Sequence, residues 1–147
     1  ELGDRSVYIG ASDIPNCPRK VILDKLDSED HDLETLVRFE RGHLAENIVA
    51  NALQSAGYGN FVRQYEVDAT ESLGVPVKAH LDFVWFGKNS VSVLEVKTVS
   101  GIPDSPYESW EMQLYAQMGF LALSGVEGQI RGAILALDLN SGQHKVF

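Results

Sequence analysis

Two carboxylates and a lysine near the middle of the chain are the residues best suited to chemistry: Asp82, Glu95 and Lys97. Asp82 lies in the hydrophobic segment 79–84, where an ionised carboxylate is costly unless a partner compensates its charge. Glu95 and Lys97 are two residues apart, so on a strand they would share one face. A hairpin turn at residues 87–89 would bring Asp82 beside that face, so that all three groups converge.

This set of side chains suits the hydrolysis of a phosphodiester bond. The reaction needs a hard cation, which neutralises the phosphate and activates a water molecule. Mg²⁺ prefers carboxylate oxygens and retains several of its waters. A lysine beside the cation can orient the attacking water or stabilise the charge that develops. We therefore expect Asp82 and Glu95 to bind Mg²⁺ or Mn²⁺, with Lys97 acting on the water.

The elements that position these residues follow from hydrophobic periodicity and turn residues. Ser12 is expected to cap a short first helix through residues 20–23, and a long helix is expected over residues 33–56, ended by Gly57. Strands are expected over residues 61–68, 75–86, 91–98 and 129–138, with a short edge strand at 144–147. Ser105 and Pro106 are expected to begin a helix that runs to residue 123.

The order of these elements indicates the fold class. A helix, three strands, a helix and a strand predict an α/β fold, in which helices flank a mixed central sheet. In the long helix, hydrophobic residues recur every four positions and predict a buried stripe made of Leu44, Ile48, Ala52 and Ala56, with Val49 and Leu53 beside it. His43 and Glu46 would share an adjacent face. The strand at 129–138 is apolar enough to be buried on both faces.

Length and composition limit the number of domains and the class of protein. The 147 residues are expected to form a single domain spanning 1–147, because that length supports one core and not two. Six acidic residues between positions 24 and 34 contribute to the net charge of −9, and they indicate a solvated linker. The charge neither favours nor excludes DNA binding. No apolar run is long enough to span a membrane, and the polar start and single cysteine, Cys17, favour a reduced, cytoplasmic setting.

These motifs together resemble the PD-(D/E)XK nuclease superfamily. Asp82 matches its first motif and Glu95-Val96-Lys97 its second, and the order of elements resembles its restriction-endonuclease-like core. Within the superfamily, the RecB-like branch adds a helical histidine, which His43 in segment 41–46 resembles, and a glutamine on the following helix, which Gln113 resembles. The resemblance implies a metal site made of His43, Asp82, Glu95 and the Val96 carbonyl, and a catalytic set of Asp82, Glu95, Lys97 and Gln113.

The start of the chain, residues 12–20, is also similar to that of the CRISPR-associated four-cysteine exonucleases. The resemblance therefore implies a divalent-metal-dependent exonuclease that acts on single- or double-stranded DNA. Two features depart from these relatives. The RecB-like glutamine is often followed four residues later by a tyrosine, where this chain has Gln117. The iron–sulfur relatives need three more cysteines, so we expect no iron–sulfur cluster in this chain.

Each residue also has a plainer interpretation. Asp82 and Glu95 could be surface carboxylates at strand ends, Lys97 a solvated strand lysine and Gln113 a polar helix residue. Glu46 reads more readily as a solvent-facing or supporting carboxylate than as a ligand, and His80 as a structural residue. Trp110, Tyr115, Phe120 and Cys17 fit buried positions in the core. The alternative function is a non-catalytic module on the same fold, which binds nucleic acid or uses its own acidic face to bind a protein partner.

Overall fold

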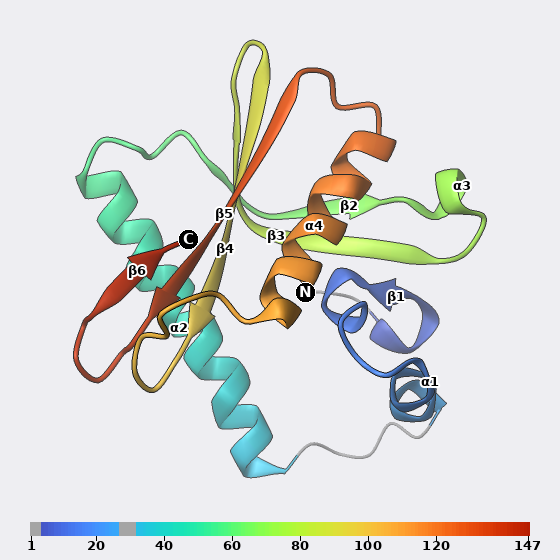
Figure 1. Ribbon diagram of the computed structural model, residues 1–147, viewed down its shortest axis with the longest axis horizontal. Coiled ribbons are helices and arrows are strands. Elements are labelled where there is room, and N and C mark those ends of the chain that lie inside the picture. The colour runs from blue at the N-terminus through green and yellow to red at the C-terminus, as the bar shows by residue number, and fades with distance from the viewer. Residues whose placement is uncertain (1–3, 27–31) are drawn as a thin grey trace.

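A mixed sheet of six strands forms the centre of the fold in a computed structural model that describes residues 4–26 and 32–147 (Figure 1). The strands are β1 (Ile9–Gly10), β2 (Val62–Asp68), β3 (Val77–Phe86), β4 (Ser90–Thr98), β5 (Gln129–Leu137) and β6 (His144–Val146). Their order is β1-β3-β4-β5-β6, with β2 beside β3. The helices are α1 (Pro18–Leu26), α2 (Leu33–Ser55), α3 (Thr70–Leu73) and α4 (Glu108–Leu123), preceded by the 3₁₀ turns η1 (Arg5–Val7) and η2 (Ala11–Asp13).

The predicted order of elements is confirmed. The chain runs through α2, β2, β3, β4, α4 and β5, which is the expected helix, three strands, helix and strand. β2, β3 and β4 are antiparallel neighbours, whereas β4 and β5 are parallel and are joined through α4. The α/β fold class with helices flanking a mixed sheet is therefore correct. No helix within residues 4–26 and 32–147 has both the length and the apolar character that crossing a bilayer requires.

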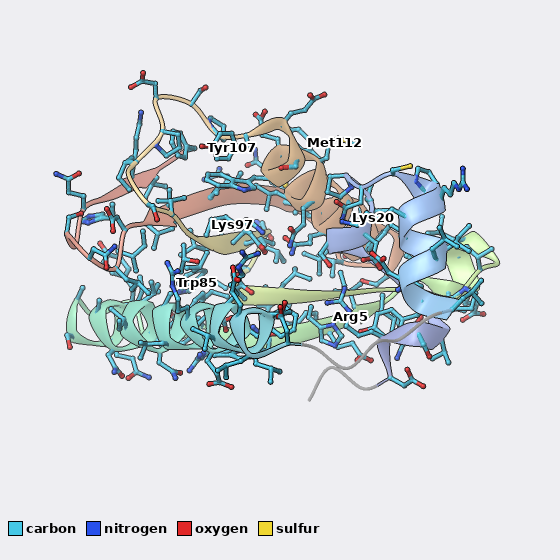
Figure 2. The ribbon with its side chains drawn as sticks, turned by 90° about the horizontal axis from the view of Figure 1, so that it is seen from below. Arg5, Lys20, Trp85, Lys97, Tyr107 and Met112 are labelled. Atoms are coloured by element: carbon cyan, nitrogen blue, oxygen red, sulfur yellow. The ribbon has the colours of Figure 1, made fainter. Side chains whose placement is uncertain are left out.

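The two long helices cover opposite faces of the sheet (Figure 2). On one face, Leu114 and Leu121 of α4 pack in a buried cluster with Leu81 and Val93. On the other face, the small residues of α2 pack in a second cluster around Phe83. The strands that carry Asp82 and Glu95 are thus enclosed from both sides, and Lys97 lies between the two helices in Figure 2.

The buried face of α2 differs from the predicted stripe. Leu44 and Ile48 are 54% and 45% exposed, whereas Ala45 and Val49 are buried. Since one residue corresponds to about 100° around a helix, the real stripe is rotated by roughly that angle. The alanines allow α2 to approach the sheet closely, a steric advantage that hydrophobicity alone does not reveal. The same rotation turns Glu46 toward the protein interior, where its exposed fraction is 8%.

The N-terminal region also differs from expectation. Ser12 lies inside η2 and caps no long helix, because α1 begins only at Pro18, whose fixed φ suits a first helical position. Cys17 precedes that helix and is exposed, so its predicted burial is wrong. The two-residue strand β1 is too short to leave a periodic pattern. Of the expected acidic linker, residues 24–26 belong to α1 and residues 33–34 to α2, while residues 27–31 lie outside the described part of the chain.

Two later boundaries need correction as well. Helix α4 begins at Glu108 after Tyr107, whose carbonyl accepts the backbone N–H of Trp110, and not at Ser105-Pro106. Strand β5 is buried only from Ile134 onward, because its first half lies at the exposed end of the sheet. Tyr115 is 65% exposed and is therefore not a core residue.

Gly128 precedes β5, and its backbone conformation, which suits only glycine, provides a test of the fold. Its φ is +99°, and an added Cβ would lie 2.5 Å from the Asn89 carbonyl oxygen, which belongs to a neighbouring backbone. We expect Gly128→Ala to lower the free energy of unfolding by about 1–3 kcal/mol. The matched control is Gly42→Ala in the open middle of α2, where a Cβ meets nothing and should stabilise by roughly 0.5–1 kcal/mol. Urea unfolding of both variants measures the two changes, and equal effects would contradict the proposed clash.

Candidate active site

At Asp82, in the middle of β3, the pairing between β3 and β4 ends and leaves an opening in the sheet. Strand β2 pairs with β3 from Lys78 to Val84 and so occupies one edge of the strand along that length. The other edge pairs with β1 at Val77 and Lys78, and with β4 only from Phe83 onward. Asp82 therefore stands just before the point where β3 and β4 meet. At this opening a side chain can reach the backbone of the neighbouring strand.

The Asp82 carboxylate uses this opening to bridge the two strands. Its Oδ2 accepts a hydrogen bond of 2.8 Å from the backbone N–H of Val96 on β4. Its Oδ1 lies 3.3 Å from the amide nitrogen of Gln64 on β2. Burial, and then the nearby charges of Glu95 and Glu46, raise the pKa of Asp82 well above its usual range, although the Val96 N–H and Lys97 oppose the shift.

Glu95 is held at both of its oxygens by residues of β4 and α4. The Lys97 ammonium and the Gln113 amide donate to Oε1 at 2.8 and 2.7 Å, and the Gln117 amide donates to Oε2 at 2.7 Å. Lys97 also donates to the Gln113 carbonyl oxygen at 2.8 Å, which closes a three-membered network. Gln113 and Gln117 are one helical turn apart, so α4 presents both amides to one carboxylate. Glu95 itself is only 3% exposed.

Gln117 is the residue that stands where a RecB-like tyrosine was expected. It is completely buried, and its amide nitrogen also lies 3.4 Å from the His80 carbonyl oxygen. Its own carbonyl oxygen is buried and has no hydrogen-bond partner among the described residues. A buried unmet acceptor is costly, so the contact with Glu95 must compensate for it.

Glu46 is a third carboxylate at the site, although the sequence predicted a solvent-facing or supporting role for it. It is nearly buried on α2, and its Oε2 accepts a 2.7 Å hydrogen bond from the same Gln64 amide that reaches Asp82. The Arg63 guanidinium lies 3.6 Å from this oxygen. The interpretation of Glu46 as a solvent-facing residue is therefore wrong, and its burial beside Gln64 is in keeping with a supporting carboxylate.

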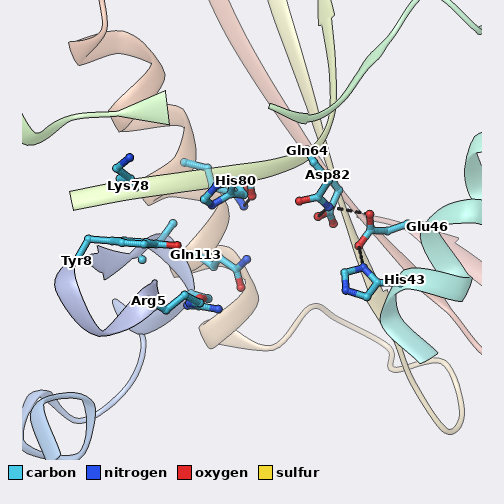
Figure 3. Close-up of a pocket in the computed structure, with 13 residues that line it drawn as sticks. Arg5, Tyr8, His43, Glu46, Gln64, Lys78, His80, Asp82 and Gln113 are labelled. Carbon is cyan, nitrogen blue, oxygen red and sulfur yellow. Dashed lines mark hydrogen bonds and ion pairs between the residues drawn. The ribbon is translucent and has the colours of Figure 1, made fainter. Parts of the chain in front are cut away.

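His43 lies at the edge of this group. Its Nδ1 is 3.8 Å from the Glu46 Oε1, and its side chain is 61% exposed (Figure 3). The structure thus brings His43 beside Glu46 and gives it no hydrogen bond to Asp82 or Glu95. His80, on β3, bonds Glu66 at 3.0 Å, in keeping with its structural interpretation.

A pocket of about 180 Å³ runs along these residues. Figure 3 shows Asp82, Glu46 and His43 at one end, and Arg5 and Tyr8 from the N-terminal segment at the other. The pocket therefore combines a strongly acidic end with a wall that comes from a different part of the chain.

The donor groups explain how three carboxylates can lie so close together. Each of the six oxygens of Glu46, Asp82 and Glu95 faces a nitrogen of the protein. In this arrangement no group of three or more histidine, cysteine, aspartate or glutamate side chains is poised to hold a metal ion among the described residues. The chemistry of the set still fits a hard cation, because a positive charge would offset the burial and the neighbouring negative charges that raise the pKa of Asp82.

The predicted residues are partly brought together. Glu95, Lys97 and Gln113 form one network, and Asp82 is bonded to the Val96 backbone beside it, whereas His43 stands at the border. Spacing indicated Asp82, Glu95 and Lys97, and the family resemblance indicated Gln113. Sequence reasoning missed Gln64 altogether, because nothing marks one glutamine within a polar strand. The pairing of Glu46 with His43 on one helix face was the available signal for Glu46.

Comparison with known proteins supports the fold. No protein-family model matches the chain, and a search of curated proteins finds no similar sequence. Among solved structures, the crystal structure of SSO0001 is similar over 95% of this chain, with a TM-score of 0.60 and 19% sequence identity. This chain spans 66% of the length of that one. At this level of identity the similarity concerns the fold and assigns no activity.

The raised pKa of Asp82 leads to a stability prediction. In the unfolded chain Asp82 ionises near its ordinary pKa, whereas in the folded chain its pKa is raised. The contribution of Asp82 to stability is therefore fully present below the ordinary pKa. It is lost as the pH rises through the pKa of the folded state. In the presence of a chelator at pH 8, Asp82→Asn should therefore have a higher melting temperature than the unsubstituted protein. The expected increase is about 2–4 °C for each kcal/mol gained in the free energy of unfolding. The gap should shrink toward pH 5.

Asp138 is the matched control for this experiment. It is also buried, but the backbone N–H of Asn140 lowers its pKa. Its stabilising contribution is present above its ordinary pKa and is lost only at lower pH. Asp138→Asn should therefore melt lower than the unsubstituted protein, by an amount that stays constant from pH 5 to pH 8. A parallel pH dependence in both variants would contradict the assignment of the effect to Asp82.

A double-mutant cycle tests the contact between Gln117 and Glu95. Gln117→Leu should cost about 1–3 kcal/mol of unfolding free energy, because it leaves a buried carboxylate oxygen without its donor. In a Glu95→Ala background the same change should cost far less, since no carboxylate oxygen is then left without its donor and the Gln117 amide has already lost this partner. Chemical unfolding in a chelator measures the four proteins. An equal cost in both backgrounds would mean that Gln117 acts only through apolar packing.

Proposed function

We propose that this protein is a divalent-metal-dependent deoxyribonuclease of the RecB-like PD-(D/E)XK type. The observation that carries the proposal is a convergence at the opening of the sheet. Glu95, Lys97 and Gln113 form one hydrogen-bonded network, and Asp82 is bonded to the backbone N–H of Val96, which lies between Glu95 and Lys97 in the chain. Sequence spacing and the family resemblance together indicate these same four residues.

Each residue has a chemical role in the proposal. Asp82 and Glu95, with the Val96 carbonyl, supply hard oxygen ligands for Mg²⁺ or Mn²⁺, and the buried Glu46 is the nearest further carboxylate. When bound, the metal ion lowers the pKa of a water molecule and neutralises the phosphate. Lys97 orients the water or stabilises the developing charge, and Gln113 fixes the Lys97 ammonium in place. His43, at the border of the site, is positioned to assist Glu46.

The pocket favours a substrate that ends inside it. Arg5 and Tyr8 line the side of the pocket away from His43 (Figure 3), where we expect them to contact the end of a strand that enters past the carboxylates. This arrangement favours exonuclease action. DNA remains the proposed substrate, although the net charge of −9 means that binding depends on local contacts and not on a broad basic surface.

The decisive experiment measures cleavage of labelled linear single-stranded, linear double-stranded and circular single-stranded DNA. Cleavage should require added Mg²⁺ or Mn²⁺ and should spare the circular substrate, while Ca²⁺ supports binding better than cutting. Asp82→Ala and Glu95→Ala should abolish cleavage. Lys97→Ala should slow it by roughly 10²-fold or more and leave metal binding largely intact, since it removes a positioned catalytic group and no ligand. Gln113→Ala should be milder.

Parallel purification of Glu95→Ala provides the control. Equal activity in that variant would reveal a contaminating nuclease. An unsubstituted protein that cuts no DNA with either metal would favour the non-catalytic module. That alternative draws support from the protein partners already present at all six carboxylate oxygens.

A further inference from the structure

Gln64 has an unusual backbone conformation at the centre of the site. Its φ is +47°, and no other non-glycine residue in ranges 4–26 and 32–147 has a positive φ. The left-handed region is unfavourable for a side chain with a Cβ, and glutamine lacks the short polar group that eases it for asparagine. In the register of β2 with β3, Arg63 pairs with Phe83 and Tyr65 with Leu81, so Gln64 lies opposite Asp82.

In this conformation the side-chain amide of Gln64 points at two carboxylates. Its amide nitrogen donates to Glu46 Oε2 at 2.7 Å and approaches Asp82 Oδ1 at 3.3 Å. Two carboxylates from different elements, α2 and β3, are thereby held to one neutral group. A backbone conformation that costs conformational energy tends to persist at a functional site, where the side chain that it positions compensates for it.

The same two oxygens are those that a cation between Glu46 and Asp82 requires. An amide N–H carries only a fraction of a positive charge, whereas a divalent ion interacts far more strongly with two buried carboxylates. The amide and the ion therefore compete for Glu46 Oε2 and Asp82 Oδ1. The longer distance to Asp82 marks the weaker of the two contacts, which is the one more easily given up.

We propose that Gln64 competes with the cation at this site: its amide holds Glu46 Oε2 and Asp82 Oδ1 in the metal-free protein and must release them before the ion binds. The inference rests on the proposed metal-dependent function. It also assigns Glu46 to the site as a carboxylate that takes part in binding the ion. Affinity for the ion is then set partly by the two Gln64 contacts that binding disrupts.

Calorimetric titration of the full chain with Mn²⁺, after treatment with a chelator, tests this role. Gln64→Gly removes the amide and accepts the positive φ without strain, so the variant should fold. It should bind Mn²⁺ about 5–10-fold more tightly, because no amide contacts to charged groups have to be broken. Gln64→Asn, whose side chain is one methylene shorter and tolerates the backbone, should also bind more tightly. The rise in melting temperature with Mn²⁺ provides a second measure.

Two controls make the outcomes distinct. Gln129→Gly on β5 introduces a glycine into another strand, far from Asp82 in the register, and should leave the Mn²⁺ affinity unchanged. Asp82→Asn should abolish binding. If the unsubstituted protein binds Mn²⁺ and Gln64→Gly binds equally or less tightly, the role of Gln64 is overturned while the metal-dependent function stands. If neither protein binds Mn²⁺, with or without single-stranded DNA, both proposals fail.

Discussion

The hydrogen bond from the Val96 backbone to the Asp82 carboxylate joins β3 to β4 where their backbone pairing has ended. Most features of the site depend on it. It requires Asp82 to be buried against β4, and this in turn brings its charge close to Glu95 on the same strand. The fold must then supply donors from α4, β2 and β4 to make the arrangement tolerable. Asp82 is buried beside Glu95 because the pairing between β3 and β4 ends at this point. Helix α4 supplies the amides that donate to Glu95.

Neutral amides carry much of this compensation. Gln64, Gln113 and Gln117 come from β2 and α4, and each donates to at least one of the three carboxylates. Amides stabilise a carboxylate without cancelling its charge, so the cluster as a whole retains its attraction for a cation. Lysine or arginine residues at these positions would satisfy the oxygens more strongly and would remove that attraction. This choice of donors fits the proposed cation site, although Glu95 also forms a salt bridge with Lys97.

The sequence predicts those parts of the structure that depend on short-range periodicity. The two-residue period of a strand places Glu95 and Lys97 on one face, and the hairpin places Asp82 nearby, so this core of the site could be predicted. Glu46 could not, because the orientation of α2 depends on the close approach of alanines and differs by one residue from the hydrophobic pattern. Gln64 could not either, since its role depends on a single backbone angle, which no local pattern encodes.

The unequal pairing of β4 has a mechanical consequence. It is paired with β5 along nine residues but with β3 along only four. Transient local opening of a protein favours regions with few contacts, so of the two edges of β4 the one paired with β3 should separate first. Such a separation moves Asp82 away from Glu95 while β4, α4 and β5 remain associated. A ligand that contacts both carboxylates would hold this seam closed, and occupancy of the site would then determine how readily backbone amides along the seam exchange with solvent.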